Sequence, residues 1–289
     1  MKILLIGHRG YLGQGLLEYL SRKNDVMGWD KEEDLFQISS EMLSKNNIEA
    51  IINLSVVADL ASPKFQVDTP GDTINVEGAK HLARVLKGSE IFWFQFSTRE
   101  VFNNIYGEND VIFTDKGYRP KFFIGENQPY SPQNFYGKSK VIAEFISESH
   151  PFSNVIRLTS PYTDHHHAAG GWVLRLIKSI AKGNPLKLNS GGYQFRDPLH
   201  TDDLGSLIEL LYECRVAGEK IHAGGGETNL ISLREFVQLV DDKVNFETAP
   251  GNDYGFAFDN SKAFKLTGWN PIVSIREKVP VILRNVLQS

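Results

Sequence analysis

The sequence predicts an α/β protein with a doubly wound parallel β-sheet, and three observations lead to this prediction. The chain opens with a short apolar run, Ile3 to Ile6, that ends at a glycine. A helical pattern follows this run directly. The same alternation of apolar runs and helical patterns continues to about residue 160. Alternating strands and helices with short connections are typical of a parallel sheet that helices cover on both faces.

The individual elements follow from their own patterns. Ile3 to Ile6 is continuously apolar, as expected for a strand buried on both faces. Leu12, Leu16 and Leu20 are spaced to form one apolar helix face. The other strands predicted in the first half are residues 25–29, 50–54, 91–96 and 154–158. The other helices predicted there are residues 40–45, 76–86 and 139–149. Later helical patterns cover residues 172–182, 203–212, 233–240 and 275–287.

The composition excludes several classes of protein. The chain has 289 residues, of which 41% are hydrophobic and 23% charged, as in ordinary globular proteins. A net charge of −4 offers no footprint for nucleic acid, so we expect no such partner. The single cysteine, Cys214, excludes an internal disulfide and thiolate-rich metal sites. No apolar run approaches the roughly 18 to 20 residues that span a membrane, and we expect a cytoplasmic protein.

A glycine-rich turn joins the first strand to the first helix, in the run Gly7-His8-Arg9-Gly10-Tyr11-Leu12-Gly13. Glycines here permit a tight turn and let the backbone approach a pyrophosphate at the helix N-terminus, although a plain turn has the same pattern. Asp30 closes the second strand twenty residues past Gly10, where an acid accepts hydrogen bonds from the adenosine ribose. The sequence therefore predicts a Rossmann domain that binds NAD. Because Arg9 and Lys31 would suit a 2′-phosphate, NADP stays open.

A tyrosine and a lysine lie four residues apart in the run Tyr136-Gly137-Lys138-Ser139-Lys140. In a helix both side chains share one face. The ammonium of Lys140 could then hold the cofactor ribose and lower the pKa of the Tyr136 phenol from about 10, which would make it a usable acid or base. A solvated helix face is the alternative for so common a spacing.

Polar residues follow the very apolar fourth strand. Ser97, Thr98, Arg99 and Glu100 come directly after this strand. Side chains at the carboxyl end of a strand in a doubly wound sheet face the ligand crevice. We expect Thr98 to bind the same substrate oxygen as Tyr136 and to orient it for hydride transfer.

Together these motifs resemble the extended short-chain dehydrogenase/reductase family of nucleotide-sugar epimerases, dehydratases and reductases. The resemblance covers nearly the whole chain. It includes Asn53-Leu54-Ser55, Asn75-Val76-Glu77-Gly78, the run from Gln194 to Asp203, and Gly268-Trp269-Asn270-Pro271.

The resemblance implies NAD(P)-dependent hydride transfer at a sugar carbon, as in a 4-keto sugar reductase or epimerase that makes surface-polysaccharide precursors. It implies Thr98, Tyr136 and Lys140 as the catalytic triplet, Glu100 as a further catalytic residue, and Arg196 as the arginine that holds the nucleotide diphosphate. A salt bridge from Arg196 to Asp197 is the alternative. A homodimer through the helix of Tyr136 is also implied. The cofactor residues are Gly7, Arg9, Gly10, Tyr11, Leu12, Gly13, Asp30, Asp34, Leu35, Leu54, Ser55, Tyr136 and Lys140, and the substrate residues are Arg99, Ser160 and Arg196.

Two lobes are expected. Residues 1–160 form the Rossmann domain, and residues 161–289 mainly form a smaller, mixed, substrate-binding lobe, from which residues 193–215 return to the first domain. No flexible linker separates the lobes, so we expect them to pack tightly.

The sequence departs from the family pattern in three places. The sugar-nucleotide dehydratases carry Asp then Glu after the threonine, whereas here Arg99 takes the place of the acid and Glu100 keeps the place of the base. Glu100 could abstract a proton next to a keto group, or it could pair with a nearby cation. Ala249 stands where the family often has an arginine for the diphosphate. Residues 103–125 form an insertion rich in aromatic residues, which could reshape the sugar pocket or contact a partner.

Three alternatives accompany this interpretation. A dehydratase and a non-catalytic NAD(P)-sensing regulator can both be built on the same fold. The run His165-His166-His167 suggests a metal site, but consecutive histidines do not converge on one ion, and we predict no metal.

Overall fold

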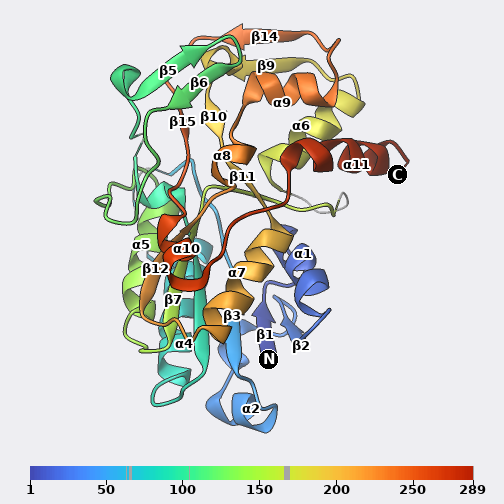
Figure 1. The fold of residues 1–289 in the computed structure, drawn as a ribbon. Helices are drawn as coiled ribbons and strands as arrows, with labels where there is room; N and C mark the ends of the chain where they lie inside the picture. The colour runs from blue at the N-terminus through green and yellow to red at the C-terminus, as the bar shows by residue number, and fades with distance from the viewer. Residues whose placement is uncertain (63, 65–66, 104, 166–169, 289) are drawn as a thin grey trace.

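A parallel six-stranded sheet forms the first lobe, in the lower half of Figure 1. The computed structural model describes residues 1–62, 64, 67–103, 105–165 and 170–288. The strands lie in the order β12-β7-β4-β3-β1-β2, and every pair is parallel. The chain order reverses between β1 and β3, which creates the crevice of a doubly wound sheet and confirms the predicted fold. The strands are β1 (Lys2–Ile6), β2 (Asp25–Trp29), β3 (Ala50–Asn53), β4 (Phe92–Thr98), β7 (Ser153–Leu158) and β12 (Glu219–Ala223).

Helices cover both faces of this sheet. Alternate residues of a strand point to opposite faces, so Ile3 and Leu5 enter one core while Leu4 and Ile6 enter the other. The first core includes residues of α1 (Tyr11–Leu20) and α7 (Thr201–Glu213). The second includes residues of α2 (Ser40–Lys45), α4 (Gly78–Val85) and α5 (Phe135–Ser147), and α3 (Pro70–Asp72) leads toward α4.

A second lobe has its own core around Ile177, Phe236 and Val279. These residues belong to α6 (Trp172–Ala181), α9 (Leu233–Val240) and α11 (Ile275–Gln288). Short strands complete the lobe: β9 (Leu186–Asn189) pairs with β14 (Phe246–Ala249), and β10 (Phe195–Arg196) lies between β13 (Ile231–Ser232) and β15 (Gly255–Phe256). β8 (Ser160–Tyr162) pairs with β11 (Pro198–His200), and the remaining helices are α8 (Gly226–Asn229) and α10 (Ser261–Thr267). Within the described ranges, no helix is long and apolar enough to cross a membrane.

The chain crosses between the lobes more often than the sequence predicts. The return to the sheet extends beyond residue 215, because β12 is the edge strand beside β7 and α10 packs against β12 and α7. The insertion forms a hairpin of β5 (Val111–Thr114) and β6 (Gly117–Pro120). This hairpin lies with the second lobe (Figure 1), and the amide of Tyr118 donates to the carbonyl of Tyr193 over 2.9 Å.

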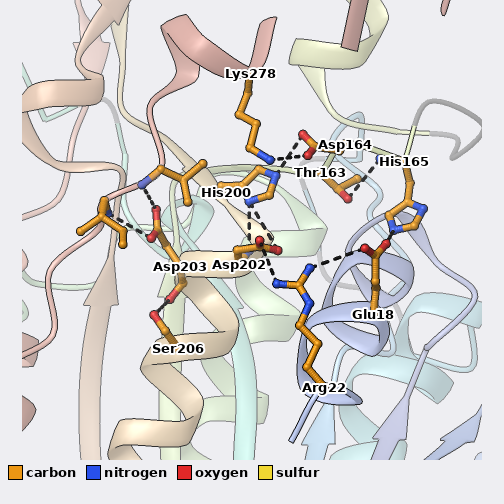
Figure 2. A network of polar contacts seen from close by, with 12 residues as sticks. Glu18, Arg22, Thr163, Asp164, His165, His200, Asp202, Asp203, Ser206 and Lys278 are labelled. Carbon is orange, nitrogen blue, oxygen red and sulfur yellow. Dashed lines mark hydrogen bonds and ion pairs between the residues drawn. The ribbon is translucent and has the colours of Figure 1, made fainter. Parts of the chain in front are cut away.

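A polar network joins the lobes at the N-terminus of α7 (Figure 2). Asp164 contacts both His200, whose Nε2 lies 3.1 Å away, and the ammonium of Lys278 from α11. The carboxylate of Asp203 is buried and accepts the amides of Ile272 and Val273, each over 3.0 Å. Asp203 therefore fixes the segment that leads from the sheet domain into α11.

We expect Asp203→Ala to lower the free energy of unfolding by about 1 to 3 kcal/mol, because two backbone amides lose their acceptor. Urea denaturation measures this loss. Asp202→Ala is the matched control: the Asp202 carboxylate is part-exposed and lies 3.5 Å from Arg22, so its removal should cost less than about 1 kcal/mol. Equal losses in the two variants would contradict the role of Asp203.

Candidate active site

The glycine turn after β1 has the geometry that the sequence predicts. Gly7 adopts a φ of +83°, in the left-handed region that favours glycine. A Cβ on Gly13 would lie 2.1 Å from the carbonyl oxygen of Gly7, so only glycine fits there. Gly10 precedes α1, whose first amides face the turn. The backbone is therefore open to a ligand at this helix N-terminus.

A cavity of about 420 Å³ lies beside this turn. Its lining contains seven of the predicted cofactor residues: Gly7, Gly10, Asp30, Asp34, Leu35, Leu54 and Ser55. The Asp30 carboxylate accepts the amides of Arg9 and Lys31 over 2.8 and 2.9 Å, so it is held at the carboxyl end of β2. Glycines that leave room for a pyrophosphate, next to an acid that suits ribose hydroxyls, fit the adenosine half of a dinucleotide.

The other predicted cofactor residues at the turn have different surroundings. The guanidinium of Arg9 lies 2.9 Å from Glu32 and 3.7 Å from Glu33, so acids already compensate its charge. This acidic surrounding suits an unphosphorylated ribose better than a 2′-phosphate. The Tyr11 ring packs against Gly171, and Leu12 packs against the core between α1 and the sheet.

Helix α5 brings Tyr136 to Thr98. The Asn134 side chain caps the helix by accepting the amide of Gly137 over 2.8 Å. A Cβ on Gly137 would lie 2.1 Å from the carbonyl oxygen of Glu100, so glycine lets α5 approach the 3₁₀ turn that follows β4. At this close approach the Thr98 hydroxyl acts to lower the pKa of the Tyr136 phenol, so the two side chains are neighbours. The two side chains that we expect to bind one substrate oxygen therefore lie next to each other.

The predicted acidification of the phenol is not present. Burial raises the pKa of Tyr136 to about 12, and the neighbouring Thr98 side chain only partly offsets this effect. The ammonium of Lys140 donates to the Phe96 carbonyl over 3.1 Å. Burial lowers the pKa of Lys140 to about 8, while Glu144 acts to raise it. At neutral pH Tyr136 is thus a proton donor, and Lys140 is a cation held against a backbone carbonyl.

A fully buried ion pair, Arg157 with Glu144, lies next to these residues. Arg157 of β7 contacts the Glu144 carboxylate with Nε at 3.0 Å and a terminal nitrogen at 2.7 Å. The same carboxylate accepts the hydroxyls of Ser97 and of Tyr130, the latter over 2.6 Å. Glu144 lies one turn beyond Lys140 on α5, and Ser97 immediately precedes Thr98. The pair therefore ties α5 to β4 and β7 beside the candidate catalytic residues Thr98 and Lys140.

A cationic groove of about 530 Å³ lies on the side of the second lobe. Arg196 lines this groove and pairs with Asp253 over 2.7 Å. The alternative pairing with Asp197 is wrong, because Asp197 is fully buried and accepts the amide of Phe258, and burial raises its pKa to about 7.

The groove also contains residues that sequence reasoning missed. Arg175 and Lys187 line it together with Arg99 and Arg196, and no acid is present among its lining residues in the described ranges. Gln194 is buried, and its Oε1 has no hydrogen-bond partner in the described part of the chain. Gln194 lies in a stretch that already resembled the family, but Arg175 and Lys187 belong to no motif. The arrangement suits an anionic ligand such as a diphosphate.

The remaining predicted residues fall in three places. Glu100 accepts the Asn134 amide over 2.9 Å and lies 3.2 Å from Arg99, so it does pair with a cation. Ser160 is buried in β8 and does not line the groove. His165 lies 3.0 Å from Glu18 (Figure 2), whereas His166 and His167 fall outside the described residues.

Comparisons with known proteins agree with the fold and the glycine turn. The model of the NAD dependent epimerase/dehydratase family matches residues 3–224, which confirms the predicted family and its NAD cofactor. A CDP-paratose 2-epimerase of Salmonella typhi is 25% identical over 334 residues, covering 96% of this chain and 97% of that protein. A probable dTDP-glucose 4,6-dehydratase of Sinorhizobium fredii is 23% identical over 333 residues, covering 99% and 93%. The UDP-glucuronic acid 4-epimerase of Bacillus cereus, solved with UDP-glucuronic acid and NAD, has the same fold, with a TM-score of 0.82, 20% identity and coverage of 100% and 99%.

The buried amine of Lys140 predicts a dependence of stability on pH. Its pKa of about 8 in the folded protein lies below its ordinary value of 10.5. Between these values the unfolded chain binds more protons, so the native state gains stability as the pH rises. We expect Lys140→Met to unfold at an equal or higher temperature than the wild type at pH 7, with a difference that shifts in favour of the wild type above pH 8. Thermal unfolding of both proteins across this range is the measurement, and a difference that does not change with pH would contradict it.

Proposed function

Because the chain belongs to the NAD dependent epimerase/dehydratase family, we propose that it transfers hydride at a carbon of a nucleotide-activated sugar, as an epimerase or a 4-keto reductase. One observation carries the proposal: the close approach of α5 to the turn after β4, which brings the Tyr136 phenol beside Thr98. Leu54 and Ser55, which line the cavity beside the glycine turn, follow β3, and Thr98 ends the adjacent parallel strand β4. Arg99, the next residue, lines the cationic groove. Thr98 is thus next in the sheet to the strand that leads into the cavity, and next in sequence to a residue of the groove.

The residues of this chain then have separate tasks. NAD, when bound, supplies or accepts the hydride. Asp30 receives the adenosine ribose, and the turn from Gly7 to Gly13 leaves room for the pyrophosphate. Tyr136 gives its proton to the sugar oxygen when a keto group is reduced, which suits a phenol whose pKa burial raises to about 12. Thr98 fixes the position of that oxygen, and we assign the ammonium of Lys140 to the nicotinamide ribose on the basis of the family resemblance.

The cationic groove supports a nucleotide diphosphate as the anchor of the substrate. Arg175, Lys187 and Arg196 bring positive charge from three elements of the second lobe. The free Oε1 of Gln194 can accept a hydrogen bond from a hydroxyl or amide of the bound molecule. These three cations take the place of the arginine that the family often has at the position of Ala249.

Water elimination, the reaction of a dehydratase, is supported less well. Such a reaction needs an acid beside the threonine to protonate the leaving hydroxyl. Arg99 occupies that place, and its guanidinium does not give up a proton near neutral pH. Glu100 is a single carboxylate, so it cannot serve as both the acid and the base of a water elimination. It is also already paired with Arg99. An epimerase or a reductase needs no second acid, which favours these two reactions.

The assembly and the pathway are also proposals. A homodimer through α5 is supported by the ring of Phe145, which is 56% exposed on this helix. We also propose, from the sequence resemblance, that the product is a precursor of a surface polysaccharide.

We expect Tyr136→Phe to lower turnover by about a hundredfold to ten-thousandfold while NAD still binds, because only the proton donor is removed. The measurement is product formation from a panel of nucleotide sugars, with NAD binding followed in parallel. Tyr118→Phe, on the hairpin of the insertion, is the control and should keep full turnover. A Tyr136→Phe enzyme with unchanged turnover would contradict the proposed role, and a wild type that converts no sugar would favour a sensor.

The cofactor that stays bound through purification distinguishes an epimerase from a reductase. An epimerase recycles its cofactor and should retain NAD through purification, whereas a reductase consumes reduced cofactor in proportion to product.

A further inference from the structure

We propose that the aromatic insertion positions Gln194 and Arg196, two residues of the cationic groove, and so takes part in binding the nucleotide diphosphate. The inference deepens the proposed function and rests on it. Two roles stood open for the insertion: a part in the sugar pocket or a surface for a partner. Several of its described residues instead contact the short segment that carries Gln194 and Arg196.

The segment from Tyr193 to Arg196 has one side toward the groove and the other toward the insertion. Gln194 and Arg196 line the groove. Phe195, which lies between them, is fully buried, and its ring packs edge-to-face on the Tyr106 ring with centroids 5.1 Å apart. Successive side chains of an extended segment point to opposite faces. A contact that fixes Phe195 therefore also sets the direction of its two neighbours.

The hairpin of the insertion fixes the residue before Gln194. The main-chain amide of Tyr118 donates to the carbonyl of Tyr193 over 2.9 Å. The Phe113 ring packs edge-to-face on the Tyr193 ring, with centroids 5.0 Å apart. Gly117 adopts a φ of +114°, and a Cβ on it would lie 2.8 Å from the carbonyl oxygen of Tyr193. Only glycine therefore lets the hairpin come this close.

An ion pair holds the hairpin against the start of α9. Arg119 of β6 lies 2.5 Å from Glu235 of α9. Glu235 also accepts the amide of Ser232, and the Ser232 hydroxyl donates to a carbonyl in the turn of the hairpin. Leu233, the next residue, donates its amide to the carbonyl of Gln194 over 3.2 Å. The hairpin, the start of α9 and Gln194 thus form one continuous set of contacts.

The placement of this backbone decides where the Arg196 guanidinium lies. One terminal nitrogen donates to the carbonyl of Phe195 over 2.7 Å, and the other donates to Asp253 over 2.7 Å. The guanidinium therefore moves with the backbone of Phe195, whose ring Tyr106 contacts. A guanidinium binds a phosphate through two parallel hydrogen bonds, and such a contact needs its groups placed within about 0.5 Å. The insertion thus supplies the rigidity that the groove requires.

Calorimetric titration of the NAD-loaded protein with UDP, CDP, GDP and dTDP tests this role. We expect Gly117→Ala to weaken binding of the tightest of the four by about tenfold, because the added methyl group pushes the hairpin away from Tyr193. Gly88→Ala is the matched control. Gly88 also has a positive φ, +78°, but a Cβ on it meets nothing within 4 Å, so nucleotide binding should change by less than about twofold. NAD binding should persist in both variants, because the glycine turn belongs to the other lobe.

A second pair of variants tests the proposal even if alanine at position 117 disrupts the fold. The side chain of Phe113 is 59% exposed, and so is that of Phe264 on α10, which does not line the groove. We expect Phe113→Ala to weaken nucleotide binding by about threefold to tenfold and Phe264→Ala by less than about twofold. The unfolding temperature of each variant reports whether the fold persists.

Combination with Arg196→Gln distinguishes positioning of Arg196 from a general loosening of the second lobe. Arg196→Gln alone should weaken nucleotide binding by about tenfold to a hundredfold. If the hairpin acts through Arg196, Gly117→Ala should weaken binding by less than about threefold in the Arg196→Gln protein. A tenfold loss in both backgrounds would overturn the proposal.

Unchanged nucleotide binding in both Gly117→Ala and Phe113→Ala would also overturn it. A wild type that binds none of the four nucleotides would overturn the diphosphate anchor together with this role of the insertion. Because binding is measured without turnover, a protein that binds a nucleotide as expected but converts no sugar would contradict the proposed hydride transfer alone.

Discussion

The geometry of the site depends on one buried ion pair, Glu144 with Arg157. Both side chains are fully buried, and the carboxylate also holds Ser97 and Tyr130. Removing one member of such a pair costs about 3 to 5 kcal/mol, because the other charge stays buried without a partner. Any displacement of α5 along β4 would separate these groups. The contact of Thr98 with Tyr136 is thus set by a neighbouring interaction that takes no part in the chemistry.

The same region carries several charged groups that burial disfavours. The amine of Lys140 is almost fully buried, and the carboxyl of Asp197 is inaccessible, with pKa values shifted to about 8 and about 7. Each shift means that the folded protein destabilises the charged form of the group. Active sites often combine such groups, since a charge that water does not screen acts strongly on a bound ligand. Burial of the Lys140 ammonium therefore lowers the stability of the fold, while it strengthens the effect of that charge on a bound ligand.

Local patterns were enough to predict the sheet, the glycine turn and the catalytic candidates. Gly13 could be found because a strand, a turn and a helix follow one another in the chain, and Thr98 because it ends an apolar run. Contacts between distant segments could not be found in this way. Arg157 lies in an ordinary strand, and nothing in its neighbours indicates Glu144 as its partner. The direction of the pKa shift of Tyr136 likewise depends on complete burial, which spacing on a helix does not reveal. The hairpin at Tyr118 pairs with the second lobe through residues far along the chain.

Hydride transfer at the sugar carbon is the central claim, and an isotope label tests it most directly. A 4-keto sugar is the substrate of a reductase and the intermediate of a 4-epimerase, and it takes its C4 hydrogen from the cofactor. The protein is therefore loaded with NADH that carries two deuterium atoms at nicotinamide C4, mixed with nucleotide 4-keto sugars, and the sugar product is examined by mass spectrometry. We expect deuterium at C4 of the product, and a reduced product without deuterium would contradict hydride transfer from the cofactor.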